Sequence, residues 1–202
     1  VTVALSQANI GRQIDTRVAD DAPAWFFIDI QPDQIDRFME IASGTKGISQ
    51  VAKTPMLRGQ VTELGGVAAA DYDMRNGSAW VLRGDRALTW SATQPESGEL
   101  IAGEWWPADY DGTPLASMTA KEARELGVWI GDTVSFNVLG RPVTAEITNI
   151  RDVEWESFSI NFVFVLSPGV LDKAPHSWMA TAHADDEDAA IRVDRNIAAV
   201  FA

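Results

Sequence analysis

The order of apolar and polar positions predicts a β–α–β unit near the start of the chain. The apolar segment 22–30 is typical of a buried strand. The residues after it place one apolar stripe on a helix, at the spacing i, i+3, i+4 and i+7: Ile35, Phe38, Met39 and Ala42. Gly44 is a natural end for this helix. The segment 47–64 then predicts a second strand, interrupted at Pro55.

The end of the chain has a similar organisation. The segment 160–169 is apolar on both faces and predicts a deeply buried strand, and the segment 176–184 predicts another. The segment 185–202 predicts a helix with an acidic first turn and one apolar stripe: Ala190, Val193, Ile197 and Phe201. A β–α–β unit that lacks its closing strand would end in this way.

Residues 1–20 predict a separate, stalk-like helix. Its apolar face is narrow and sparse, with four members: Val3, Ile10, Ile14 and Val18. A helix of this kind packs poorly alone. The chain also begins in mid-pattern, without a start methionine or a signal peptide. We therefore expect a fragment of a longer protein whose chain continues upstream.

The middle of the chain, residues 60–159, differs from both ends because many turn residues separate short strand-like pieces. We therefore predict an α+β fold in which one subdomain is discontinuous. Its two parts are 21–59, a β–α–β unit, and 160–202, which adds a strand and a helix. A second, β-rich subdomain over 60–159 is inserted between them.

One stretch of this middle part joins a short helix to a strand. Thr119 and Glu122 have the spacing of a capping box, and Gly127 stands where the chain leaves the helix. Gly131 and Asp132 then turn the chain into an alternating strand, followed by a hairpin and a second alternating strand with a bulge near residues 148–150. Such glycines occur both at ligand sites and at plain chain reversals. In phosphate loops, however, the glycines come before a helix, whereas Gly127 and Gly131 come after one.

Composition and charge exclude several classes of partner and chemistry. The formal net charge is −13, from 29 acidic and 16 basic residues, so the surface should repel nucleic acids and anionic lipid head groups. The chain contains no cysteine, which removes disulfides, thiolate metal sites and cysteine nucleophiles. Apolar residues make up 46 % of the chain, a proportion typical of globular domains.

The residues that carry chemistry do not assemble into a recognisable catalytic site. His176 and His183 lie seven positions apart and should point to opposite faces of one strand. The segment 71–77 starts like a calcium loop, but Arg75 occupies the fifth position, where such loops need Asp or Asn. The sequence therefore predicts a protein that is not an enzyme and that has neither cofactor nor metal site.

The tryptophans are the most unusual feature, because the chain has eight. Trp105, Trp106 and Trp155 stand among carboxylates and are candidates either for an interaction groove or for packing, with packing favoured. Two alternatives stay open. One is a secreted ligand-binding module with a tryptophan-lined groove. The other is a hydrolase in which Glu104 converges with Glu154 or Glu156.

Several segments together resemble the extracytoplasmic domain of an FtsX-like, MacB-like ABC transporter permease, most of all of the YbbP type. The resemblance extends from about Trp25 to the end of the chain and is most specific over 123–175. It rests on five segments: FFIDIQPDQIDRF, PMLRGQV, IAGEWWP, SWMATAH and the long block that begins ARELGVWIGDTVSF.

The resemblance implies a soluble fragment of a membrane protein, on the periplasmic side of the bacterial inner membrane. It implies a split "porter" part, an inserted "sabre" part and a mechanical role, in which ATP hydrolysis by a separate cytoplasmic subunit moves the outer domain. Further implied partners are a periplasmic protein, a lipid or other hydrophobic substrate, and a second or pseudo-symmetric copy of the domain. Under this interpretation Gly127, Gly131 and Asp132 form a structural junction.

Overall fold

The computed structural model describes residues 25–73, 77–96, 98–153 and 160–201. The predicted stalk helix over 1–20 lies outside this part. The described residues divide into two compact units. The first contains 25–55, 160 and 176–201, and the second contains 56–153 and 161–175 apart from the gaps given above.

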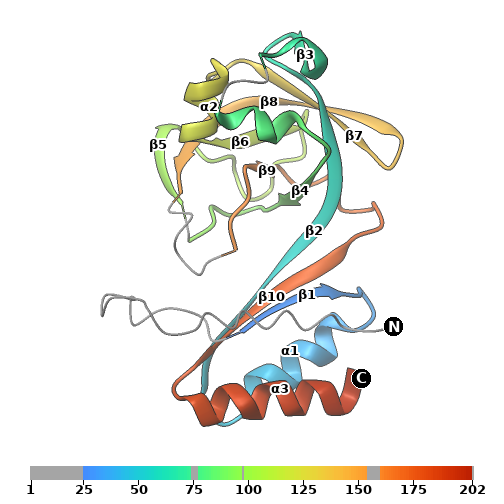
Figure 1. The fold of residues 1–202 in the computed structure, drawn as a ribbon, viewed down its shortest axis with the longest axis vertical. Helices are drawn as coiled ribbons and strands as arrows, with labels where there is room; N and C mark the ends of the chain where they lie inside the picture. The colour runs from blue at the N-terminus through green and yellow to red at the C-terminus, as the bar shows by residue number, and fades with distance from the viewer. Residues whose placement is uncertain (1–24, 74–76, 97, 154–159, 202) are drawn as a thin grey trace. The chain divides into compact units, whose positions relative to one another are not determined.

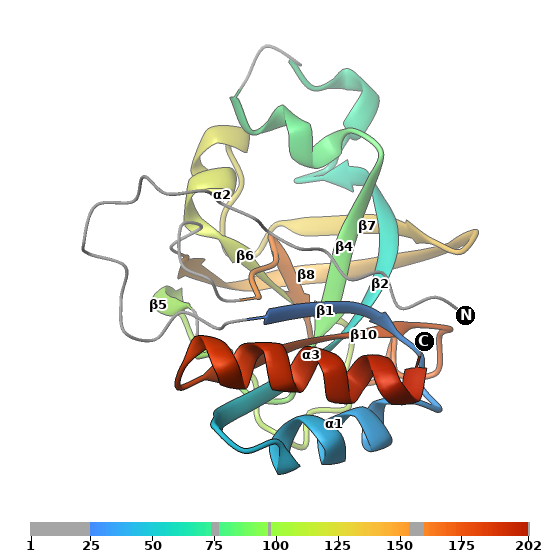
Figure 2. The same cartoon turned by 60° about the horizontal axis from the view of Figure 1, so that its bottom comes forward.

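The first unit combines strands with two helices (Figure 1). Its sheet has the order β1–β10–β2, and β1 and β10 are antiparallel. Helices α1 and α3 lie side by side (Figure 2). The elements are β1 (Trp25–Ile30), α1 (Ile35–Gly44), the first part of β2 (Ile48–Leu64), β10 (Ser177–Ala184) and α3 (Glu187–Phe201).

The core of the first unit lies between the two helices and the strands. The predicted stripe on α1 is confirmed, since Ile35, Phe38 and Ala42 are buried and the rings of Phe27 and Phe38 meet edge to face at 4.8 Å. The stripe on α3 differs by one position at its start. Ala189 is fully buried there in place of Ala190, because residues 189, 193 and 197 keep a spacing of four along one side of the helix.

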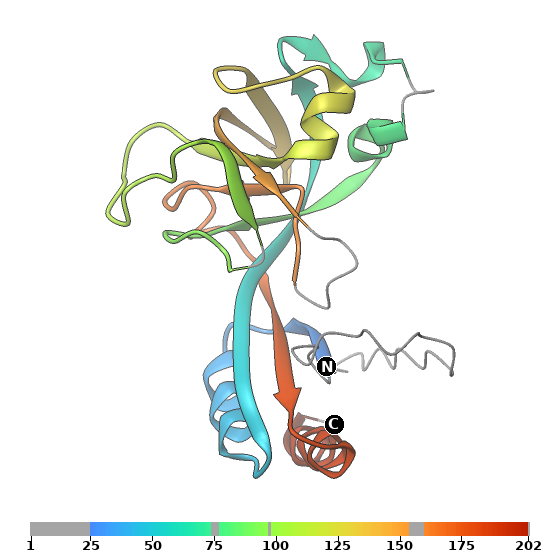
Figure 3. The same ribbon diagram turned by 90° about the vertical axis from the view of Figure 1, so that its left-hand side faces the viewer.

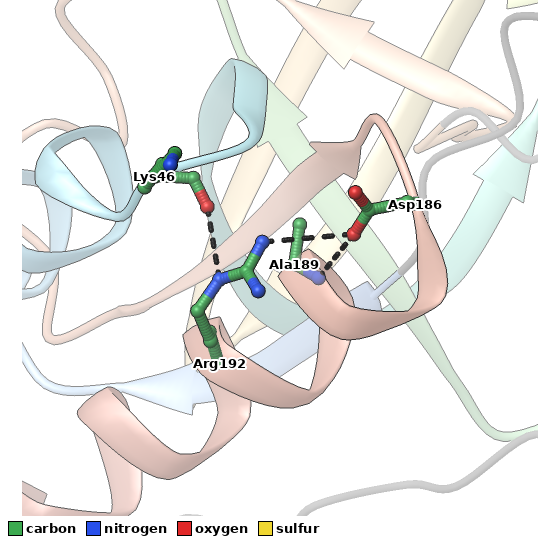
Figure 4. Close-up of polar contacts among 4 residues, drawn as sticks. All are labelled: Lys46, Asp186, Ala189 and Arg192. Carbon is green, nitrogen blue, oxygen red and sulfur yellow. Dashed lines mark hydrogen bonds and ion pairs between the residues drawn. The ribbon is translucent and has the colours of Figure 1, made fainter.

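Helix α3 is attached at its start to the turn between α1 and β2 (Figure 4). The Asp186 carboxylate accepts the backbone N–H of Ala189 at 2.6 Å and lies 3.6 Å from the Arg192 guanidinium. Arg192 Nε donates to the carbonyl of Lys46 at 3.2 Å. The next residue, Gly47, has φ +86°, and a Cβ there would lie 2.7 Å from that of Ala189. The helix and the turn therefore approach too closely for any side chain at position 47.

Strand β2 is continuous from residue 48 to residue 64, so the predicted interruption at Pro55 is wrong (Figure 3). Proline fits an extended backbone and lacks only the N–H that a ladder would use. The pairing of β2 with β4 begins at Leu57, beyond the proline, so this missing donor leaves that ladder intact. Residues 48–55 of the strand lie in the first unit and residues 56–64 in the second.

The second unit is rich in strands. Its two long strands are the end of β2 and β8 (Arg141–Asp152). The remaining elements are β3 (Val67–Ala68), η1 (Ala69–Asp71), η2 (Gly77–Leu82), β4 (Asp85–Trp90), β5 (Glu99–Gly103), β6 (Leu115–Thr119), α2 (Ala120–Leu126), β7 (Thr133–Val138) and β9 (Phe164–Leu166).

Six of these strands close into a ring in the order β2–β4–β9–β6–β8–β7 and back to β2. The pairs β4–β9 and β6–β8 are parallel and the other four are antiparallel. Strand β5 adds to the far end of β8, outside the ring. Because closure pairs the edges of the sheet with each other, the inward side chains form one continuous core.

The alternation predicted from the sequence places the expected residues in this core. Val134, Phe136 and Val138 of β7 are buried. The predicted bulge is confirmed as well, because the register of β8 against β6 shifts at Thr148. The segment 161–175 lies in this unit, although the predicted boundary placed 160–202 in the other. The reason is that β9 pairs with β4 and β6, which the sequence pattern does not reveal.

The α+β class predicted from the sequence is confirmed. Helices α1 and α3 accompany the strands of the first unit, and α2 belongs to the strand-rich second unit.

Candidate functional site

Helix α2 begins at a buried pair of polar side chains. Thr119 and Glu122 have 1 % and 2 % of their surface exposed, and the Thr119 hydroxyl donates to the Glu122 carboxylate. A capping box would instead direct each side chain to a backbone N–H of the other residue. The spacing predicted from the sequence therefore brings the two residues together, but their side chains bond to each other.

The helix ends at Gly127, as predicted. This residue has φ +74°, and its N–H reaches the carbonyls of Ala123 and Arg124. Val128 N–H then bonds to the Ala123 carbonyl at 3.0 Å, and the Val128 side chain is buried. No atom lies within 4 Å of a Cβ built on Gly127, so the left-handed backbone, and not crowding, is what favours glycine here.

The turn from Trp129 to Asp132 is held by four hydrogen bonds. Asp132 Oδ2 accepts the Trp129 N–H at 2.7 Å, and the Asp132 N–H returns to the Trp129 carbonyl at 3.1 Å. Gly131 N–H donates to the Ile147 carbonyl at 2.8 Å, and Ile147 N–H donates to the Asp132 carbonyl at 2.8 Å. The junction residues Gly131 and Asp132 thus join the turn to β8 and give it a defined backbone.

Tyr72 lies close to the same turn. Its hydroxyl donates to the Leu64 carbonyl at 2.7 Å. Burial, followed by the negative charge of Asp132, raises the pKa of Tyr72 above its ordinary value. Asp132 therefore acts on its neighbours through its charge as well as through its hydrogen bonds.

Two exposed apolar side chains belong to this turn, and a third, Ile101, is exposed on β5 two positions before Gly103. Trp129 is 48 % exposed, Ile130 38 % and Ile101 49 %. They come from two segments that meet at Gly103, where a Cβ would lie 3.0 Å from Cδ1 of Ile130 and 2.2 Å from the Thr148 carbonyl oxygen. We call Ile101, Trp129 and Ile130 the Trp129 patch. It contains the sort of side chains that soluble domains normally bury or cover with a partner.

The tryptophan pair selected from the sequence lies just after β5. The rings of Trp105 and Trp106 are 4.2 Å apart, and their indole N–H groups donate to the carbonyls of Ala92 and Ser91, at 3.2 and 2.9 Å respectively. Trp106 is only 5 % exposed and Trp105 is half-buried. Both polar ends are therefore used inside the fold. Trp155, the third candidate, lies outside the described residues.

The interior also contains a cation that the sequence pattern did not identify. Arg151 is 1 % exposed, and its guanidinium donates to Ser117 Oγ at 2.6 Å and to the Phe162 carbonyl at 3.1 Å. Burial lowers the pKa of Arg151 to about 10. The bulge at Thr148 lets Ile150 follow Ile147 on the face of β8 that lines the barrel core, and it puts Arg151 on the opposite face beside Ser117, where both residues are buried as well.

The hydrolase alternative gains no support from the described side chains. Glu104 is exposed, whereas Glu154 and Glu156 lie outside the described residues. Within the part that the structure describes, no three His, Cys, Asp or Glu side chains are grouped so that they would hold a metal ion.

Sequence analysis missed Trp129 and Ile130 as surface residues, although it singled out the turn that carries them. One signal was present. Two large apolar residues stand between Gly127 and Gly131, at a chain reversal where polar residues are usual. Nothing in the sequence singled out Ile101, which lies on β5.

Comparison with known proteins gives one clear relative. No family model matches the chain. The chain is 29 % identical over 161 residues to the ABC transporter permease YbbP of Escherichia coli strain K12, an uncharacterized protein. The match covers 80 % of this chain and 19 % of the relative, so the chain spans about a fifth of the permease's length. The predicted resemblance to an ABC transporter permease of the YbbP type is thereby confirmed.

The solved structures that match include two extracellular or permease domains. The extracellular domain of the ABC-type transporter YknZ from Gram-positive bacteria has 12 % identity and a TM-score of 0.45, covering 85 % of this chain and 82 % of that one. A domain of a permease protein from Porphyromonas gingivalis has 14 % identity and a TM-score of 0.39, covering 75 % and 61 %. In the described part of this chain, none of the helices combines the length and the apolar character that crossing a membrane requires.

Proposed function

We propose that this chain is the extracytoplasmic domain of an ABC transporter permease, on the periplasmic side of the bacterial inner membrane. The observation that carries the proposal is the similarity to YbbP over 80 % of the chain. In this proposal the first unit corresponds to the porter-like part and the second unit to the inserted, sabre-like part. The domain transmits movement and catalyses no reaction.

The two units have the organisation that a mechanical role needs. Each has a hydrophobic core of its own, so each can move as a rigid body. Strand β2 passes from one to the other without a break. Movement of a membrane segment attached to the first unit would therefore reach the second unit along an extended strand, which resists stretching.

The contacts of α3 support the same role. Arg192 bonds to the Lys46 carbonyl, Asn196 Nδ2 to Thr45 Oγ1 at 3.0 Å, and Asp185 N–H to the Gly47 carbonyl at 2.8 Å. A force applied at α3 would then displace the whole first unit, because two bonds from the helix and one from Asp185, just before it, oppose its detachment from the α1–β2 turn.

The partners and cargo belong to the same proposal. A cytoplasmic ATPase subunit supplies the energy, and it acts through membrane helices outside this chain. The cargo is a lipid or another hydrophobic compound that is exported or extracted at the outer face of the inner membrane. A second or pseudo-symmetric copy of the domain completes the transporter.

Location is tested first, in cells that make the full-length protein. Antibodies to this domain are used to follow it through an alkaline carbonate wash and through protease treatment of intact cells, spheroplasts and lysed vesicles. The proposal requires an antigen that stays with the membrane and is cut in spheroplasts. An antigen that washes off, or that is cut only after lysis, would overturn it.

Movement is tested with spin labels on the full-length transporter. The described chain has no cysteine, so labels can be placed singly once other cysteines are removed. Ile191 on α3 and Leu139 in the second unit are exposed and form the reporting pair. Leu139 and Val67, both exposed in the second unit, form the control pair. We expect ATP to change the first distance and not the second, and an ATPase-inactive partner to abolish the change.

A further inference from the structure

The Trp129 patch has the composition of a protein-binding centre. It joins an exposed tryptophan to two exposed isoleucines within a unit whose other large apolar residues mostly lie in the barrel core. Tryptophan is among the residues that contribute most to binding when a partner covers it. Exposed fractions of 48 %, 38 % and 49 % for Trp129, Ile130 and Ile101 leave between a third and a half of each residue's surface available to such a partner.

The patch is also held in place before any partner arrives. The four hydrogen bonds of the 129–132 turn fix the backbone of Trp129 and Ile130 relative to β8. Ile130 is confined further by the close approach of Gly103, which allows no side chain of its own. A partner would therefore bind a preformed surface, and little conformational entropy would be lost on this side.

The segments that carry the patch have more acidic than basic side chains near them in the sequence. The stretch from Ala87 to Ala120 contains five carboxylates and no lysine or arginine: Glu96, Glu99, Glu104, Asp109 and Asp111. Glu99 and Glu104 flank Ile101 in the sequence, and Glu146 precedes Ile147, which bonds to the turn; all three are exposed. The basic residues that border this stretch are Arg86 before it and the exposed Lys121 and Arg124 of α2 after it, and Arg151 is buried.

This charge pattern distinguishes between three molecules that could cover the patch: a second copy of this chain, a lipid surface and another protein. A second copy seated face to face on the patch would bring the same carboxylates together, and like charges oppose such contact. An anionic lipid surface would be repelled by the same groups. A protein segment with apolar residues at its centre and lysine or arginine at its rim would match both the patch and its surroundings.

We propose that the Trp129 patch is the docking site for a protein partner with an apolar centre and a basic rim. Ile101, Trp129 and Ile130 form the contact, and Glu99, Glu104 and Glu146 attract and orient the partner. This inference uses the proposed function in one respect only, which is that the partner is a periplasmic protein.

The test is photo-crosslinking in living cells that make the full-length protein. Trp129 is replaced by p-benzoylphenylalanine, and after irradiation the attached peptide is identified by mass spectrometry. Leu139 is the matched control position, because it is 65 % exposed and lies in the same unit beyond the opposite end of β7. At about 3.3 Å per residue, the strand separates the two positions by roughly 20 Å.

A charge-neutral variant, Glu99→Gln with Glu104→Gln and Glu146→Gln, completes the design. The proposal expects a protein adduct at Trp129 that is absent at Leu139, with a basic and apolar segment at the attachment point. The neutral variant should lower the yield roughly threefold or more, since one exposed ion pair is worth up to about a fivefold change in affinity.

Four results would overturn the proposal: equal adducts at both positions, an adduct only with lipid or with a second copy, an acidic segment at the attachment point, or a yield unchanged by the neutral variant. The location experiment is scored separately. A docking adduct in a protein that failed the membrane test would remove the permease function and leave the docking site in place.

Discussion

The Asp132 carboxylate accepts the backbone N–H of Trp129 at 2.7 Å and so closes the turn that presents the tryptophan at the surface. The same residue also bonds through its backbone to Ile147 of β8. Asp132 thus closes the turn through its side chain and ties the turn to β8 through its backbone.

Removing this carboxylate should loosen the turn. We expect Asp132→Ala to lower the free energy of unfolding by about 1–2 kcal/mol, because a hydrogen bond to a partly buried charged acceptor is lost. Asp132→Asn keeps an acceptor and should cost less. Urea unfolding of the two variants measures the difference, and an Ala variant with an unchanged midpoint would contradict this role for the side chain.

The charge of Asp132 should be visible in the titration of Tyr72. Burial is the larger cause of the raised pKa of Tyr72, and the Asp132 charge is the smaller one. Asp132→Asn should therefore lower that pKa, but not to the ordinary value for tyrosine. Ultraviolet absorbance at alkaline pH reports it, since the chain has only two tyrosines, and Tyr110→Phe isolates the signal. An unaltered titration curve would rule out the electrostatic contribution.

Two glycines with similar backbones should respond very differently to alanine. Gly127 and Gly103 have φ +74° and +76°. A Cβ on Gly127 meets no atom within 4 Å, so Gly127→Ala should cost only the left-handed strain of about 1–2 kcal/mol. A Cβ on Gly103 would lie 2.2 Å from the Thr148 carbonyl oxygen, so Gly103→Ala should cost roughly 3–5 kcal/mol. Equal losses in thermal unfolding would show that β5 can move away from β8.

The stability cost of replacing Ser117 should depend on whether the buried guanidinium of Arg151 is present. Ser117→Ala alone removes an acceptor from a buried charge and should cost about 1–3 kcal/mol. In an Arg151→Met background the serine has already lost its partner, so the same change should be nearly neutral. A double-mutant cycle by urea unfolding measures the coupling, and additive losses would contradict it.

Arg151 also predicts a dependence on pH. Its pKa in the folded state, about 10, lies below the ordinary value for arginine, so between these two values the unfolded chain binds more protons than the folded one. Stability attributable to this residue therefore rises as the pH increases through about 10. Relative to Arg151→Met, the wild-type chain should gain stability in that direction, and a constant difference would argue against the lowered pKa.

The attachment of α3 should depend on Asp186 and Arg192 and not on the neighbouring Arg195. Asp186→Ala removes both a helix cap and an ion pair and should cost about 1 kcal/mol, and Arg192→Ala should cost roughly 0.5–1 kcal/mol. Arg195 is exposed on the same helix, and Arg195→Ala is expected to stay within about 0.5 kcal/mol of wild type. Amide hydrogen exchange of α3 would detect the loosening directly, and equal exchange in all three variants would contradict it.

Local features of this protein follow from the sequence alone, because they depend on neighbours along the chain. The spacing of Ile35, Phe38 and Ala42 indicated the buried side of α1, and the alternation of Val134, Phe136 and Val138 indicated that of β7. Gly127 marked the end of α2 because a left-handed backbone favours glycine wherever it occurs. The order of several such segments was also enough to indicate the resemblance to a permease.

The tertiary structure alone decided the features that require distant segments to meet. Closure of the barrel depends on the pairing of β9 with β4 and β6, which no local pattern specifies. Arg151 lies on the face of β8 opposite to Ile147 and Ile150 and is buried there beside Ser117, a residue 34 positions away. Trp129 is exposed although tryptophan usually packs, because the turn is tied to β8 and nothing else in the described chain covers it. Periodicity shows which side of an element is apolar, but only the fold determines what, if anything, lies against it.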